Sequence, residues 1–196
     1  MWPNWKLPGP FKGKVVLEDL IYPKYFLGNW VVESFDLEDE KSEILKYPVK
    51  FRLNQKGEVV GNRAFNANSI AKEIFGEKLK YVEDDPNSSN RQLAVFEDRN
   101  FLETKIIGRE EQFLPNSFIS DELSLQIFHS AKTRITQVET LSKYSKCNES
   151  RINSNNYSSN DICGEQWQIV YKGPGENISQ EPLRKYHFKL LLHSPL

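Results

Sequence analysis

The segment "RAFNANSI" carries the polar side chains with the most specific spacing. Arg63 and Asn66 lie where an expected strand meets an expected helix. A guanidinium group and a helix N-terminus both bind carboxylates and phosphates, so the pair could hold the acidic group of a ligand. A structural role explains the same residues: Asn66 caps the helix and Arg63 pairs with a nearby acid. Both interpretations stay open, and both residues are candidate ligand-binding residues.

The two cysteines suggest a covalent cross-link. Cys147 and Cys163 flank "NESRINSNNYSSNDI", a segment so rich in Asn and Ser that it can bury almost nothing. We expect residues 148–162 to form a flexible insertion. A disulfide across it would stabilise the fold by about 3 kcal/mol in an oxidising compartment. Two free thiols are the alternative, and a mobile polar loop gives no metal-binding geometry.

The remaining chemistry-bearing residues do not form a catalytic pattern. The sequence has no G-x-S-x-G turn, phosphate-binding glycine loop or H-E-x-x-H helix motif. Of the three histidines, His187 and His193 share an expected strand. They would lie about 20 Å apart there, too far to share a metal. We therefore expect no catalytic residue, no metal site and no cofactor, and we predict a non-enzymatic protein.

Composition limits the classes of partner. The chain has 196 residues, enough for one domain, and 26 basic residues against 27 acidic ones. The sequence also contains no run of basic residues interleaved with aromatic residues, so nucleic acid is not an expected partner. No apolar run approaches the roughly 20 residues that span a bilayer, so no membrane span is expected.

The elements expected to position these residues are mainly β-strands. Runs of alternating or β-branched residues recur between turn signals such as "NQKGE", "DDPNSSN" and "KGPGEN". The expected strands are 30–37, 47–54, 58–65, 78–83, 91–97, 101–107, 134–141, 165–172 and 184–193. Many short strands of this kind favour an antiparallel sheet that closes on itself or forms a sandwich.

One helix is expected within this pattern. In "NANSIAKEIFG", apolar residues recur at the spacing of one helical face, Asn66 can cap the start, and Gly76 can end the helix. The segment 120–129 could form a second short helix, because Ser120 can cap it. An edge strand explains that segment equally well. We therefore expect one or two short helices.

The ends of the expected sheet carry a recognisable pair of features. Gly28 precedes Trp30 by two residues at the first strand, and Arg184 begins the last strand. Gly28 would leave room for a segment to cross beneath the indole, and Arg184 could stack on the indole face. This combination resembles the lipocalins and the wider calycin group. The resemblance implies an antiparallel β-barrel whose end is closed by Gly28, Trp30 and Arg184.

A second resemblance covers most of the chain. The strings "DLIYPKYFLGNWVVES", "RAFNANSIAKEIFG", "DPNSSNRQ" and "QVETLSKY" resemble a family of uncharacterised proteins of cyanobacteria and plant plastids. This implies an oxygenic phototroph and a lumenal or periplasmic location, without an established activity. The insertion between the cysteines is unusual for that family. A location in the thylakoid lumen or periplasm requires a targeting segment missing from this chain; otherwise the protein is cytoplasmic.

These observations lead to one fold and two main functions. We expect an extended arm over residues 1–24 and a single calycin-like β-barrel domain over residues 25–196. The first function is binding of an apolar or amphipathic small molecule, a lipid or pigment, inside the barrel. The alternative is a protein-binding assembly or maintenance factor for a photosynthetic membrane complex, and a third is a bilin-lyase-like enzyme. Besides Arg63 and Asn66, the expected ligand-binding residues are Trp30, Val32, Phe51, Tyr186 and Phe188.

Overall fold

The protein folds into one curled antiparallel sheet of eleven strands. The computed structural model describes residues 3, 18–39, 41–147, 160–173 and 182–195. The strand order is β1-β4-β3-β2-β11-β10-β9-β8-β7-β6-β5. The strands are β1 (Ile21–Tyr22), β2 (Gly28–Asp36), β3 (Leu45–Leu53), β4 (Val59–Gly61), β5 (Leu79–Asp85), β6 (Ser88–Phe96), β7 (Phe101–Leu114), β8 (Ser117–His129), β9 (Arg134–Lys146), β10 (Ile162–Lys172) and β11 (Arg184–His193).

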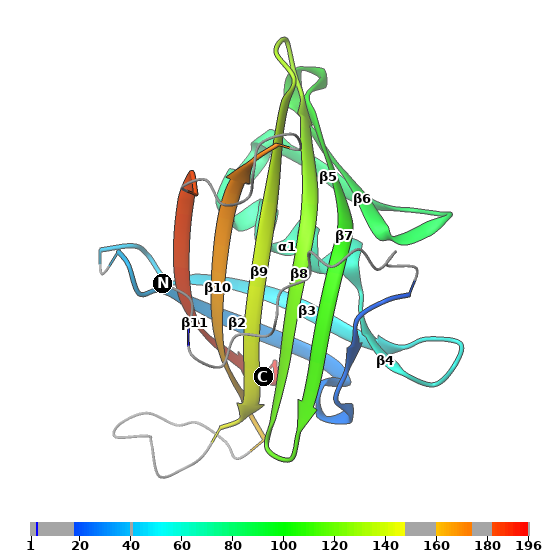
Figure 1. The fold of residues 1–196 in the computed structure, drawn as a ribbon, viewed down its shortest axis with the longest axis vertical. Helices are drawn as coiled ribbons and strands as arrows, with labels where there is room; N and C mark the ends of the chain where they lie inside the picture. Colours follow the sequence, from blue (N-terminus) through cyan, green and yellow to red (C-terminus); the bar gives the residue numbers. More distant parts are fainter. Residues whose placement is uncertain (1–2, 4–17, 40, 148–159, 174–181, 196) are drawn as a thin grey trace.

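The sheet forms a lipocalin-like half-barrel, which confirms the expected mainly-β class. The long strands β7 to β10 run along the longest axis, and β2 and β3 cross behind them (Figure 1). β1 and β5 are the two edges of the sheet, so the described strands curl without closing a ring. One α-helix, α1 (Arg63–Phe75), packs against β3, β5 and β6. The described residues also form three short 3₁₀ turns, η1 (Lys24–Phe26), η2 (Gly76–Lys78) and η3 (Glu97–Arg99).

The main core lies on the concave face, at the end of the sheet formed by β2 and β3. In β3 the buried side chains of Tyr47, Val49 and Phe51 alternate with exposed residues, which are Lys46, Pro48, Lys50 and Arg52. β2 repeats the pattern, because side chains of a strand point to alternate faces. Phe26 is fully buried at the centre of this cluster, and its carbonyl accepts a hydrogen bond from Trp30 Nε1 at 2.7 Å.

The end of the expected arm is part of the sheet. Leu20 is 2% exposed, and β1 pairs with β4 through Ile21 opposite Val60. Residues before Glu18 lie outside the described chain, apart from Pro3. The Trp-Pro arm and most of the expected insertion at 148–162 therefore lie outside the described residues.

Gly28 has a conformational role rather than the expected steric one. Its φ is 129°, a region that side-chain-bearing residues rarely adopt, and a Cβ built there would meet no atom within 4 Å. Glycine is favoured at this position because of its backbone conformation and not because a neighbouring segment fills the space of a side chain.

The expected contact between Arg184 and Trp30 is wrong. Strand β11 pairs with β2 through His193 opposite Val31, so Trp30 lies near the C-terminal end of β11. Arg184 begins β11 about 30 Å away along the strand. It is exposed, and its Nη1 donates to the Tyr186 hydroxyl at 3.4 Å.

Helix α1 confirms the expected helix but begins earlier. Asn62, not Asn66, caps it: its side chain accepts from the Phe65 N–H at 3.4 Å. Gly76 ends the helix with a φ of 56°, as expected. The segment 120–129 belongs to the long strand β8, which pairs on both sides, so neither a helix nor an edge strand forms there.

The two cysteines form a disulfide that joins the end of β9 to the start of β10. The Cα atoms of Cys147 and Cys163 lie 5.0 Å apart. β9 and β10 also pair directly, with Cys163 opposite Ser145. Among the described residues, no helix is both long and apolar enough to cross a membrane.

Candidate functional site

The concave surface has three zones, each marked by an inward-pointing residue of β8. Phe118 packs at one end against the aromatic core, and Glu122 lies at the centre of a charged cluster. Phe128 lies at the other end and lines a cavity. All three have the same parity, and Phe128 follows Glu122 by six residues, or about 20 Å of strand. The concave face therefore changes from packed apolar core, through partly buried charge, to an open aromatic cavity.

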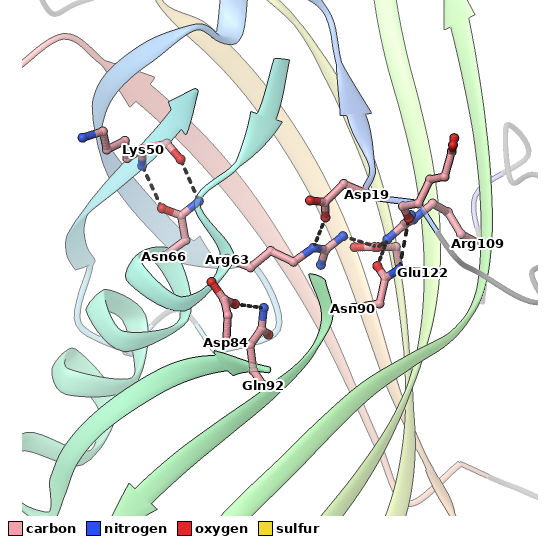
Figure 2. A network of polar contacts seen from close by, with 10 residues as sticks. Asp19, Lys50, Arg63, Asn66, Asp84, Asn90, Gln92, Arg109 and Glu122 are labelled. Atoms are coloured by element: carbon pink, nitrogen blue, oxygen red, sulfur yellow. Dashed lines mark hydrogen bonds and ion pairs between the residues drawn. The ribbon is translucent and has the colours of Figure 1, made fainter. Parts of the chain in front are cut away.

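The charged cluster joins five segments through Glu122. Arg63 at the start of α1 donates from Nε to Asp19 Oδ1 at 2.8 Å and from Nη2 to Glu122 Oε1 at 2.9 Å (Figure 2). Arg109 of β7 donates to the same Glu122 oxygen from Nη2 at 2.6 Å and from Nε at 2.9 Å. Asn90 of β6 accepts from Arg109 Nη2 at 2.8 Å. The cluster thus holds α1, the chain before β1, and β6 to β8 together.

The backbone entering β1 is also held by the cluster. The carbonyl oxygen of Glu18 accepts from Arg109 Nη1 and, at 3.0 Å, from Asn90 Nδ2. Tyr22 then packs its ring edge-on against Phe51, with centroids 4.8 Å apart. These contacts fix the segment 18–22 across the concave face.

The protonation states agree with a structural role. Burial favours the neutral carboxyl of Glu122, but the guanidinium groups of Arg63 and Arg109 outweigh it and hold the Glu122 pKa below its ordinary value. Burial likewise opposes the charge of Arg63, but Glu122 raises the Arg63 pKa. Burial raises the pKa of the Tyr22 and Tyr144 phenols. Glu122 is therefore an anion between two cations and is not poised for proton transfer.

Arg63 therefore has the structural role that competed with ligand binding, and Asn66 has a structural role other than the expected helix cap. Two N–H groups of Arg63 already face carboxylates. Asn66 joins α1 to β3, because its Oδ1 accepts from the Lys50 N–H at 2.7 Å and its Nδ2 donates to the Lys50 carbonyl at 3.2 Å (Figure 2). A bilin-lyase-like site built on Arg63 has no support from this geometry.

The apolar and aromatic residues expected to line a ligand site divide into two groups. Trp30, Val32 and Phe51 are 7%, 4% and 8% exposed and belong to the packed core. Tyr186 and Phe188 are half-buried on β11, with stacked rings whose centroids are 5.9 Å apart. None of these five residues lines the cavity at Phe128. Trp30, Val32 and Phe51 therefore pack in the core at the β2–β3 end of the sheet.

The cavity at Phe128 has a volume of about 420 Å³, within the usual range for small-molecule sites. Its apolar walls come from α1, β6, β7 and β8. Phe96 contacts Phe75 edge-on at 5.3 Å and Phe128 at 6.1 Å. Leu102 pairs with Phe128 across β7 and β8. Phe75 is 46% exposed although it ends the helix beside this wall, so the cavity presents aromatic surface to solvent.

A charged rim surrounds this aromatic floor. The polar and charged lining residues are Lys78, Glu97, Asp98, Asn100 and Arg134. The guanidinium carbon of Arg134 lies 5.2 Å from the centre of the Phe128 ring, a cation–π contact. A hollow with an apolar floor and charged groups at its edge can bind a molecule that has both an apolar and a polar part.

A second, larger cavity of about 810 Å³ lies at the opposite end of the long strands. It is formed by the tip of the β7–β8 hairpin, η1 and the end of β9. Half of its lining side chains are polar, among them Lys143 and Lys146, and the hairpin tip contributes Phe113. Phe113 is 53% exposed. Its aromatic lining residues are Tyr25 of η1 and Phe113 of β7.

Sequence reasoning missed both central features of the concave face. In the sequence Arg109 and Glu122 look like ordinary charged residues, and nothing in their positions indicates that they meet. Phe96 lies in an expected strand. Phe128 lies in the segment 120–129, whose sequence suits a short helix as well as an edge strand. Only the pairing of β6, β7 and β8 brings these residues to one surface.

Comparison with known proteins identifies a family but no activity. No curated protein and no solved structure is significantly similar to the chain. One family model, described as a domain of unknown function (DUF6816), matches residues 35–193. The match covers β3 to β11 and all of the residues lining the aromatic cavity. The chain belongs to the DUF6816 family.

Proposed function

We propose that the protein is a non-enzymatic, lipocalin-like binder of an apolar or amphipathic small molecule such as a lipid or pigment. The observation that carries the proposal is the cavity of about 420 Å³ lined by Phe75, Phe96, Leu102 and Phe128. Burial of a ligand's apolar part there would gain roughly 25 cal/mol for each Å² removed from water. The open concave face of a half-barrel gives the ligand a route of entry.

The aromatic cavity is a better candidate than the larger one at the hairpin tip. Its walls come from a helix and three strands, and rigid elements hold a binding surface more firmly than a hairpin tip does. Edge-on packing among Phe75, Phe96 and Phe128 also fixes the ring orientations.

Binding is tested by titrating the protein with a fluorescent fatty acid such as 11-(dansylamino)undecanoic acid. Leu102→Trp fills the cavity from β7 and is expected to weaken binding at least tenfold. Leu53→Trp is the matched control, because Leu53 is 52% exposed and lies away from the cavity. Phe113→Ala reports on the second cavity and is expected to leave binding unchanged.

Three results would contradict the proposal: absence of probe binding, unchanged binding in Leu102→Trp, or loss of binding in Phe113→Ala. Native mass spectrometry before and after organic extraction then identifies the natural ligand. A discrete mass released by extraction is expected. A bare polypeptide would favour the alternative of a protein-docking factor, whose expected contact surfaces lie outside the described residues.

We extend the proposal to an oxidising compartment, the thylakoid lumen or periplasm of an oxygenic phototroph. The Cys147–Cys163 disulfide supports it, because structural disulfides persist mainly in such compartments. Fractionation of the native host tests the location, and recovery of the protein only from the cytoplasm or stroma would contradict it.

A further inference from the structure

The charges on the rim of the aromatic cavity are balanced and come from different elements. Lys78 lies at the end of η2 and Arg134 at the start of β9. Glu97 and Asp98 lie in the turn η3 between β6 and β7. All four line the same cavity as the phenylalanine rings. The rim therefore carries two positive and two negative side chains around one opening.

These four side chains do not neutralise one another. Within the described part of the chain, none of them takes part in an ion pair. The guanidinium group of Arg134 instead contacts the Phe128 ring. All four side chains are exposed, so each charge remains available to a ligand that enters the cavity from solvent.

The acidic side of the rim is held in an unusual conformation. Asp98 and Arg99 have φ values of 55° and 60°, in the left-handed region that an arginine rarely adopts. Hydrogen bonds from Phe96 N–H to the Asn100 carbonyl at 2.9 Å and from Asn100 N–H to the Glu97 carbonyl at 3.2 Å close this turn. Strained turns of this kind occur where a surface must be presented in one arrangement.

We infer that the ligand of this cavity is an amphiphile whose head group carries both a positive and a negative charge. This inference rests on the proposed function. A purely anionic head group would meet Glu97 and Asp98, and a purely cationic one would meet Lys78 and Arg134. A zwitterionic head group can place its anion beside the two cations and its cation beside the two carboxylates. The apolar tail then packs on the phenylalanine floor.

The test compares four probes that have nearly identical saturated tails of eleven or twelve carbons and differ in the head group. Binding of dodecylphosphocholine, dodecanoate, dodecyltrimethylammonium and dodecyl maltoside is measured by isothermal titration calorimetry below their micelle-forming concentrations. We expect the phosphocholine probe to bind at least tenfold more tightly than each of the other three. Leu102→Trp is expected to abolish binding of all four.

Rim variants separate the two charges of the head group. Arg134→Gln should weaken phosphocholine binding about tenfold and improve binding of the trimethylammonium probe. The double variant Glu97→Gln/Asp98→Asn should weaken phosphocholine binding similarly and improve dodecanoate binding. The matched controls Arg99→Gln and Glu77→Gln remove neighbouring charges that do not line the cavity, and they should change no affinity more than twofold.

Failure of this inference differs from failure of the proposed function. Equal affinities for all four probes, each abolished by Leu102→Trp, would overturn the zwitterion and leave the binding function intact. Tightest binding of dodecanoate or of the trimethylammonium probe would also overturn it. Absence of binding by every probe, including the dansyl fatty acid, would overturn both.

Discussion

At the scale of single residues, close packing decides which glycines are essential. A Cβ at Gly164 would lie 2.7 Å from Cε1 and 2.8 Å from Cδ1 of Tyr144, and 3.2 Å from Cβ of Leu190. Tyr144 cannot move freely, because its ring packs edge-on against the fully buried Phe26 at 5.3 Å. The ring of Tyr144 therefore occupies the space that a side chain on β10 would need.

Gly164→Ala should consequently lower the free energy of unfolding by about 1–3 kcal/mol, the usual cost of overpacking a core. Urea unfolding followed by tryptophan fluorescence measures it. Gly61→Ala is the control, because a Cβ there would meet its nearest atoms at ordinary distances of 3.5 Å or more. Equal stability of the two variants would show that the core near Tyr144 adapts more than its packing indicates.

At the scale of elements, the cluster around Glu122 joins α1 to the sheet. Removal of this carboxylate leaves the guanidinium groups of Arg63 and Arg109 close together and without their shared partner. Breaking a buried ion pair in this way costs more than the pair contributes to stability. The sheet and the helix depend on the cluster because it lies where five segments meet.

Glu122→Gln should lower the free energy of unfolding by about 3 kcal/mol at pH 7. The Glu122 pKa is lowered in the folded state, so its contribution is present above the unfolded pKa and is lost as the pH falls through the folded pKa. The difference between wild type and variant should therefore shrink below about pH 4.3. Urea unfolding across pH 3–7 checks this.

Glu18→Gln is the matched control for Glu122. Its side chain pairs with Lys56 at 2.7 Å, but the two side chains are 72% and 64% exposed. Exposed pairs contribute little, so the free energy of unfolding should change much less than in Glu122→Gln. A loss as large as that of Glu122→Gln would mean that burial does not govern these ion pairs.

At the scale of the whole molecule, the disulfide restricts the unfolded chain. Cys147 and Cys163 are separated by 16 residues and close the segment between β9 and β10. β9 and β10 lie in the middle of the sheet, so their association matters for the entire half-barrel. In the chain-entropy model a cross-link of this length contributes about 3 kcal/mol.

Cys147→Ser/Cys163→Ser should accordingly lower the free energy of unfolding by about 3 kcal/mol and lower Tm. Reduction of the wild type with dithiothreitol should lower its Tm similarly and leave the Tm of the double variant unchanged. Thiol titration of the non-reduced, denatured wild type should detect no free thiol. Two free thiols would contradict the disulfide and restore the alternative open in the sequence.

The alternation of apolar and polar residues was sufficient to predict most elements. In β3, Tyr47, Val49 and Phe51 point inward at a period of two, which is a local property of the chain. The helical spacing and Gly76 likewise indicated α1 and its end. The helix cap was misplaced because Asn62 and Asn66 are both good capping residues, and only the contact with Lys50 separates their roles.

The candidate site could not be predicted from the sequence, because long-range contacts bring its residues together and local patterns do not reveal such contacts. Ser120 to His129 suits a capped helix as well as a strand, and pairing with both β7 and β9 makes it a central strand. That pairing gathers Phe96, Leu102 and Phe128 into one wall and brings Glu122 between two arginines. It also separates Arg184 from Trp30, because register sets which ends of two strands meet.

The sequence by itself determined the β-rich class, the helix after β4, the absence of catalytic motifs and the cysteine pair, because periodicity, turn residues and motif spacing are short-range properties. The tertiary structure alone decided that the sheet stays an open half-barrel, that its β2–β3 end is filled by aromatic core, and that a cavity with a balanced charged rim lies at the other end. Strand order, register and curl bring together residues that are far apart along the chain, and those long-range contacts place every residue of the candidate site.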